Sequence, residues 1–252
     1  MIGVSCTQFP CESPQVWLDR IVGKFELWEI FSEVEHSVST HKVLFADLLP
    51  SYDLNYSIHA PICDINLSSL CQRIREASIK ETVSTIMAAN DLDIRTVTVH
   101  PGLSSLVVHG LEGRAIEVAN KVMKGLDKIS EEYGVTIAIE NMPNMPFFLG
   151  RTAQELSEII DGTNLSVCFD VGHANTTGQI DQMIEAFGDR IANIHIHDNH
   201  GVSDEHLAIG DGDIEYVDVF SKLSDYQGNF VIESKNFDSA LESQDRIAGM
   251  LE

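Results

Sequence analysis

Short apolar runs alternate along the chain with longer stretches whose apolar residues recur every three or four positions. The short runs are typical of buried strands, and the three-to-four spacing is typical of amphipathic helices. The pattern predicts strands at residues 2–5, 24–30, 54–59, 96–100, 135–140, 166–170, 191–195 and 230–234. It predicts helices at residues 14–22, 40–49, 67–90, 111–133, 152–160, 180–187, 216–223 and 239–251.

Eight strand–helix units in one chain predict a closed parallel (β/α)₈ barrel, the TIM-barrel fold. Neither a linker nor a shift of composition divides the sequence, so we expect residues 1–252 to form a single domain. A doubly wound open sheet is the alternative. It is disfavoured because no Gly-x-Gly-x-x-Gly motif follows the first predicted strand.

Six consecutive predicted strands end in a residue type that binds metals. These residues are His59, His100, Glu140, Asp170, His195 and Glu233. Taken singly, each is more often a structural ion pair, a cap or a core histidine. In a TIM barrel, however, the carboxyl ends of the strands meet at one mouth, where active sites lie. A mixed set of imidazoles and carboxylates suits Zn²⁺, Mn²⁺ or Fe²⁺, so the convergence predicts a divalent-metal site.

Further candidate ligands follow the sixth and seventh strands, in segments that the pattern assigns to loops. His173 lies three residues after Asp170, and Asp204 and His206 lie shortly before Gly210-Asp211-Gly212. Spacing alone leaves a solvated loop as an equal alternative for Asp204 and His206. Lys235 follows Glu233 by two residues, and we expect it to be a surface lysine or a contact for a phosphate or ketone.

Charge and composition restrict the kinds of binding partner and the cellular setting that the chain suits. The chain has 16 Lys and Arg against 39 Asp and Glu, a net charge of −23, which disfavours binding to a nucleic-acid backbone. No apolar stretch approaches the length of about 20 residues that a bilayer requires. The amino terminus lacks the features of a signal peptide, and we expect a cytoplasmic protein.

The cysteines argue against a disulfide framework, because their number is odd and no two of them form a Cys-x-x-Cys pair. They are Cys6, Cys11, Cys63, Cys71 and Cys168.

Several of these motifs resemble those of the xylose-isomerase-like barrels, which include sugar (phosphate) isomerases and epimerases and the endonuclease IV repair enzymes. The resemblance runs from His59 to Glu233. It is carried by Phe169-Asp170-x-x-His173, His195-Ile196-His197-Asp198-Asn199, Asp204-x-His206 and Gly210-x-Gly212. His197 has the same parity as His195, but the family's His-x-x-Asp pattern favours His195 as the ligand. These motifs are specific for the superfamily and separate its members poorly.

The resemblance implies one of two ligand sets. The isomerase and epimerase branch binds one metal through four positions, which match Glu140, Asp170, His195 and Glu233. The endonuclease branch holds three zinc ions and adds positions that match His59, His100, His173, Asp204 and His206. All nine positions carry a matching residue, so we expect one to three ions, with zinc or manganese favoured. Against the endonuclease branch, Ile62 replaces its DNA-wedging aromatic residue, and the loops contain little Lys or Arg.

The resulting hypothesis is a metal-dependent isomerase or epimerase of a small sugar, keto-polyol or sugar phosphate. Glu140 and Glu233 would remove and return a proton as a pair of general acid–base groups. The alternatives are a phosphodiesterase of the endonuclease IV type and a non-catalytic barrel that binds metal or sugar. The expected partner is a small carbohydrate, and the sequence leaves the oligomeric state open.

Overall fold

Eight parallel strands close into one barrel, in which each strand pairs with its neighbours in chain order and β1 also pairs with β8. The computed structural model describes residues 1–5, 11–105, 107–108 and 110–251. The strands are β1 (Ile2–Ser5), β2 (Leu27–Phe31), β3 (Asn55–His59), β4 (Thr96–Val99), β5 (Thr136–Glu140), β6 (Ser166–Asp170), β7 (Ile191–Ile196) and β8 (Asn229–Glu233). The predicted TIM barrel is confirmed.

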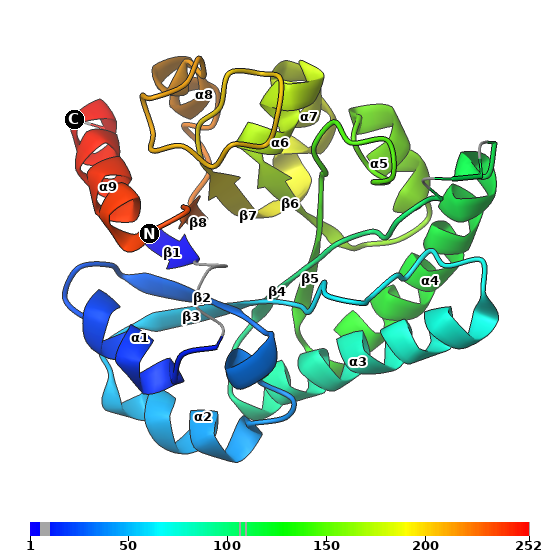
Figure 1. Ribbon diagram of the computed structural model, residues 1–252, viewed down its shortest axis with the longest axis horizontal. Coiled ribbons are helices and arrows are strands. Elements are labelled where there is room, and N and C mark those ends of the chain that lie inside the picture. Colours follow the sequence, from blue (N-terminus) through cyan, green and yellow to red (C-terminus); the bar gives the residue numbers. More distant parts are fainter. Residues whose placement is uncertain (6–10, 106, 109, 252) are drawn as a thin grey trace.

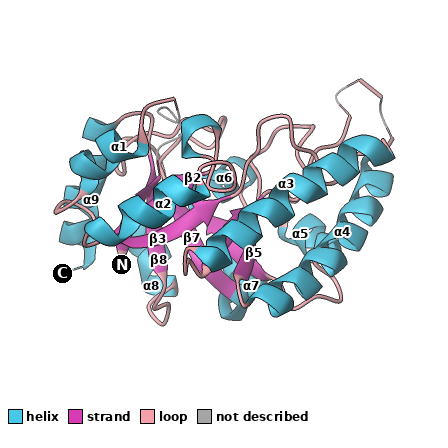
Figure 2. Ribbon diagram, turned by 90° about the horizontal axis from the view of Figure 1, so that it is seen from below, coloured by secondary structure: helices cyan, strands magenta, loops and turns pink. Residues whose placement is uncertain are grey.

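Helices surround the strands, and both ends of the chain lie on the same side of the barrel (Figure 1). The helices are α1 (Pro14–Ile21), α2 (Lys42–Leu48), α3 (Gln72–Asp91), α4 (Glu112–Tyr133), α5 (Ala153–Ile159), α6 (Val171–Thr177), α7 (Ile180–Phe187), α8 (Tyr216–Lys222) and α9 (Phe237–Leu251). The two long helices α3 and α4 run side by side (Figure 2). Among the described residues, no helix is both long and apolar enough to cross a membrane.

One helix was not predicted and two predicted boundaries are wrong, each for a local reason. Helix α6 was not predicted, and it places His173 in a helix rather than a loop because the Asp170 carboxylate accepts the His173 backbone N–H at 2.6 Å. Strand β2 begins at Leu27 because residues 24 and 25 bond back to the Ile21 carbonyl at the end of α1. Helix α3 begins at Gln72, and a side-chain turn at Asn66 occupies the preceding segment.

Along each strand, side chains alternate between the apolar core beneath the helices and the inside of the barrel. Ile58, Val97 and Ile139 are fully or almost fully buried in the large apolar core that includes residues of the outer helices. The residues next to these three in sequence point into the barrel, because side chains alternate along a strand. Apolar side chains on the outer face therefore hold the helices to the sheet, as expected for parallel strands buried on both faces.

Inside the barrel, the layer just below the mouth is largely polar. Asn193 donates to Glu29 Oε2 at 2.7 Å and to Thr98 Oγ1 at 3.1 Å, and Ser57 donates to the same Glu29 oxygen at 3.0 Å. All four side chains are fully buried. Because TIM barrels are usually filled by branched apolar residues, this hydrogen-bonded layer indicates that the interior supports the polar groups above it.

Cys6 lies outside the described residues. Cys11, Cys63, Cys71 and Cys168 are free thiols, in agreement with the absence of a disulfide framework among the described cysteines.

Replacing Ile58 with Ala tests the role of the outer core. Ile58 is 0% exposed, so its truncation should lower the free energy of unfolding by about 2–5 kcal/mol. Ile74→Ala on helix α3 is the matched control, because Ile74 is 50% exposed and should change stability little. Urea unfolding followed by circular dichroism measures both. Equal stability of the two variants would contradict this assignment of the core.

Candidate metal centre

The structure brings the nine predicted residues together at the carboxyl ends of the strands. Their donor atoms fall into neighbouring groups in which all members lie within 4.8 Å of one another. We name them the rim group (His59, His100, Glu140), the central group (two trios that share His195: Glu140, Asp170, His195 and Glu29, His195, Glu233) and the loop group (His173, His197, Asp204, His206). The groups are contiguous, because Glu140 belongs to the rim and central groups and lies 3.5 Å from His173 of the loop group.

Glu140 is the junction between the rim and central groups. Its Oε2 lies 3.1 Å from His59 Nε2 and 3.0 Å from His100 Nε2. Its Oε1 lies 3.2 Å from His195 Nδ1 and 3.5 Å from His173 Nδ1. Burial alone would raise the pKa of Glu140, but His100 and His195 hold it well below its ordinary value. Glu140 is therefore an ionised carboxylate surrounded by imidazoles.

His195 is enclosed by carboxylates on both sides of its ring. Its Nδ1 faces the mouth, at 3.2 Å from Glu140 and 3.3 Å from Glu233. Its Nε2 lies 2.7 Å from Glu29 Oε1 inside the barrel. Burial would raise the pKa of Glu29, but its contact with His195 lowers the pKa overall. Because the ionised Glu29 can only accept, Nε2 of His195 carries a hydrogen that it donates to Glu29, and Nδ1 is the ring nitrogen that faces the mouth.

Backbone carbonyls orient three other imidazoles, which are held at Nδ1 and present Nε2. Nδ1 of His59 lies 2.8 Å from the Ala60 carbonyl, Nδ1 of His173 lies 2.9 Å from the Asn141 carbonyl, and Nδ1 of His206 lies 3.4 Å from the Glu233 carbonyl. In each case Nε2 faces a carboxylate of the site, either Glu140 or Asp204. Fixing one nitrogen as a donor and presenting the other is the arrangement typical of metal-binding histidines.

The loop group and the adjacent Asp170 of the central group contain buried polar atoms that form no hydrogen bond. Both ring nitrogens of His197 and one oxygen each of Asp170 and Asp204 have no hydrogen-bond partner. His197 Nε2 nevertheless lies 3.2 Å from Asp170 and 3.4 Å from Asp204. Burial would raise the pKa of Asp204, but His173 and His206 lower it strongly, and Asp204 raises the pKa of His206 to about 9 against the opposing effect of burial. Such close, unbonded donor atoms are what a bound cation would satisfy.

Asp198 anchors the loop that carries Asp204 and His206 over the barrel. Its carboxylate accepts the backbone N–H groups of Asn199, Gly210 and Ile214, at 2.9, 2.8 and 3.2 Å. Its own backbone pairs with that of Leu207. A Cβ at Gly212 would lie 2.3 Å from Asp198 Oδ1, which explains the glycine there. The motif after β7 therefore shapes the loop and holds part of the donor set in place.

Glu29 and His197 are the two site residues that the sequence reasoning missed. Glu29 lies in the middle of β2, and its only signal was an acidic residue in an otherwise apolar run. His197 was weighed as a competitor of His195, yet the two lie in different groups of one site. His195 and His197 are two residues apart at the end of β7, and this spacing was the signal that both side chains face the same side of the strand. Lys235 is exposed.

The residues present fit divalent cations. Five carboxylates and six imidazoles converge, most of them fully buried, and such a set is suited to Zn²⁺ or Mn²⁺. The orphaned oxygens of Asp170 and Asp204 and the unbonded His197 ring support this fit independently of the residue types.

Comparisons with known proteins identify the family of the chain. Residues 24–251 match the family described as the xylose isomerase-like TIM barrel. A Methanocaldococcus jannaschii protein, named only as uncharacterized, is 35% identical over 260 residues, which cover 99% of this chain and 89% of its own. A probable endonuclease 4 of Thermoplasma volcanium is 28% identical over 231 residues, covering 85% of this chain and 74% of its own.

Solved structures are similar over nearly the whole chain. A D-tagatose 3-epimerase-like protein superposes with a TM-score of 0.91 at 32% identity, covering 99% of this chain and 96% of its own. Endonuclease IV of Thermus thermophilus gives 0.72 at 20% identity, covering 99% and 98%. The IOLI protein with a bound zinc atom gives 0.80 at 16% identity, covering 98% of each chain. The last two identities support a shared fold alone.

Gly172→Ala tests whether the His197 ring belongs to the metal centre. A Cβ at Gly172 would lie 2.1 Å from His197 Cε1, so the ring must move. We expect affinity for zinc to fall by about 10–100-fold, the scale for disturbed support of a metal site. Gly113→Ala on helix α4 is the control, because an added Cβ meets nothing within 4 Å. Zinc titration by calorimetry measures both, and equal affinities in two folded variants would contradict the assignment.

Proposed function

Because the chain belongs to the xylose isomerase-like TIM-barrel family, we propose that it is a metal-dependent isomerase or epimerase of a small sugar, keto-polyol or sugar phosphate. One observation supports this most directly. Glu140 and Glu233, at the ends of β5 and β8, both lie against Nδ1 of His195, at 3.2 and 3.3 Å. Two buried carboxylates on one centre form a pair able to remove and return a proton.

Glu140, Asp170, His195 and Glu233 would hold the metal of this reaction, and zinc or manganese is favoured by their donor types. The rim and loop groups provide room for one or two further ions. When bound, a divalent cation supplies polarisation of the substrate carbonyl and stabilises negative charge on its oxygen.

The protein's own residues would orient the substrate and move the proton. Both carboxylates are buried, and Glu233 is slightly more accessible, with 7% of its side chain exposed against 1% for Glu140. A sugar whose reacting carbons lie between these carboxylates would lose a proton to one and regain it from the other. Glu29 would keep His195 in one orientation while this happens, because their contact is on the far side of the ring.

A small carbohydrate is the proposed partner. The D-tagatose 3-epimerase-like protein is similar at 32% identity, and the net charge of −23 opposes a nucleic-acid backbone. Ile62, where endonucleases of the family would carry a wedging aromatic residue, adds to this preference.

Solvent hydrogen exchange tests the acid–base pair. Dihydroxyacetone and the common ketohexoses, incubated with metal-loaded enzyme in D₂O, should gain deuterium at the carbon beside the carbonyl. Glu233→Gln should lower this exchange by about 10²–10⁴-fold, the range for a general acid or base. Glu215→Gln, outside the donor groups, is the control and should exchange at the wild-type rate. Conversion of a ketose without deuterium uptake would instead indicate a hydride shift and overturn the roles given to the two glutamates.

A phosphodiesterase of the endonuclease IV type is the second candidate, and the loop group favours it. Its four residues extend the donor set beyond what a single ion needs, and clustered ions can activate water and stabilise a leaving oxygen. The acidic surface leads us to expect no cleavage of a duplex containing one abasic site at 0.1–1 enzyme equivalents. Gel electrophoresis measures this, with Glu233→Gln as the inactive control. Catalytic nicking that the variant lacks would make this the preferred function.

A further inference from the structure

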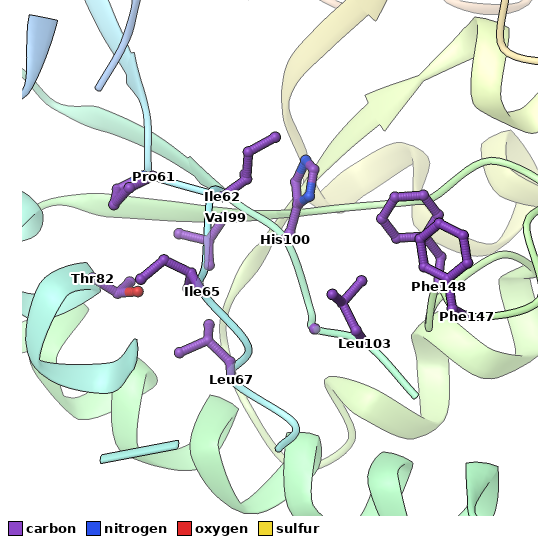
Figure 3. Close-up of a pocket in the computed structure, with 11 residues that line it drawn as sticks. Pro61, Ile62, Ile65, Leu67, Thr82, Val99, His100, Leu103, Phe147 and Phe148 are labelled. Carbon is purple, nitrogen blue, oxygen red and sulfur yellow. The ribbon is translucent and has the colours of Figure 1, made fainter. Parts of the chain in front are cut away.

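An apolar cavity of about 170 Å³ lies beside the rim group. Its walls come from the segment after β3, from helix α3, from the end of β4 and from the segment between β5 and α5. Figure 3 shows Ile65 and Leu67 on one side of the space, Leu103, Phe147 and Phe148 on the other, and His100 at one end. His100 is therefore a wall of the cavity and, through its 3.0 Å contact with Glu140, a member of the candidate metal centre.

Polar side chains are scarce in the lining of the cavity, as far as the structure describes it. Thr82 is the one other lining residue with a polar side chain, and its hydroxyl already donates to the Ser78 carbonyl at 3.0 Å. His100 uses Nε2 on Glu140. A hydroxyl group placed among these carbon atoms would lose its bonds to water without replacement, which is unfavourable. An apolar group of similar size gains from leaving water.

We propose that this cavity is a substrate subsite for an apolar group of about the size of a phenyl ring, attached to the polar part that binds at the metal centre. A dry cavity of roughly 150 Å³ is known to admit benzene, so the volume fits one ring. The T-shaped arrangement of His100 and Phe148, with ring centroids 6.3 Å apart, provides flat faces and edges for it. The inference rests on the proposed function for the polar part. It assigns the substrate to hydroxy-ketones or sugars that carry an apolar substituent, rather than to fully hydroxylated sugars.

Two hydroxy-ketones test the subsite. 2-Hydroxyacetophenone and dihydroxyacetone share a carbonyl beside a hydroxyl, and only the first carries a ring. Calorimetric titration of the zinc-loaded protein should give about 10–100-fold tighter binding of 2-hydroxyacetophenone, the gain expected for burying one ring. Nuclear magnetic resonance should show shifts at the methyl groups of Ile65, Leu67 and Leu103.

Ile65→Phe should fill part of the cavity and remove most of this preference, with dihydroxyacetone binding unchanged. Ile74→Phe on the exposed face of α3 makes the same substitution outside the cavity and should retain the preference. If Ile65→Phe fails to fold, Leu103→Ala enlarges the cavity instead and should favour 2-hydroxy-4'-methylacetophenone over the parent compound.

Equal binding of the two ketones, an unchanged preference in Ile65→Phe, or no binding of either ketone would overturn the subsite. Failure of the proposed function has a different signature. In that case ring-dependent binding and the methyl shifts persist, while neither ketone exchanges hydrogen with D₂O.

Discussion

Burial removes water from the Glu140 carboxylate at the mouth of the barrel, and four imidazoles surround it in place of water. Its two oxygens contact His59, His100, His173 and His195 at distances between 3.0 and 3.5 Å. Removing one charge from such a buried set leaves its partners uncompensated, at a cost of several kcal/mol. Residues at or just after the ends of β3, β4, β6 and β7 thus all contact Glu140 on β5. The other donor residues lie around this cluster.

The barrel provides this balance through the alternation of its strands. Outward residues such as Ile58 and Ile139 bind the helices by apolar contact. Inward residues form the polar layer of Glu29, Asn193 and Thr98, and the next inward positions carry the donor groups. The residues that stabilise the fold and the residues of the candidate site therefore lie on opposite faces of the same strands. This separation allows a cluster of buried charged groups inside a stable fold. The apolar cavity beside His100 extends this division, because it places an apolar surface directly against the polar one.

Most of the fold and much of the site could be predicted because both depend on strand period and strand ends. The barrel follows from eight repeated units, and the six strand-end residues converge because parallel strands end at one rim. The neighbouring positions depend on contacts that a single sequence does not specify. Glu29 was missed because its role comes from His195, far away in the chain, and helix α6 was missed because Asp170 acts as a cap as well as a candidate ligand. The place of His197 in the site could not be predicted without knowing that Gly172 leaves space for its ring.

The central claim is that these groups form one divalent-metal centre, and anomalous X-ray diffraction tests it most directly. Crystals grown from protein purified without chelator, measured above and below the zinc and manganese edges, would locate each ion. The account predicts an anomalous peak about 2.0–2.3 Å from donor atoms of Glu140, Asp170, His195 and Glu233 if the ion is zinc. The absence of any peak after soaking in both metals, with the donor groups still arranged as here, would contradict it.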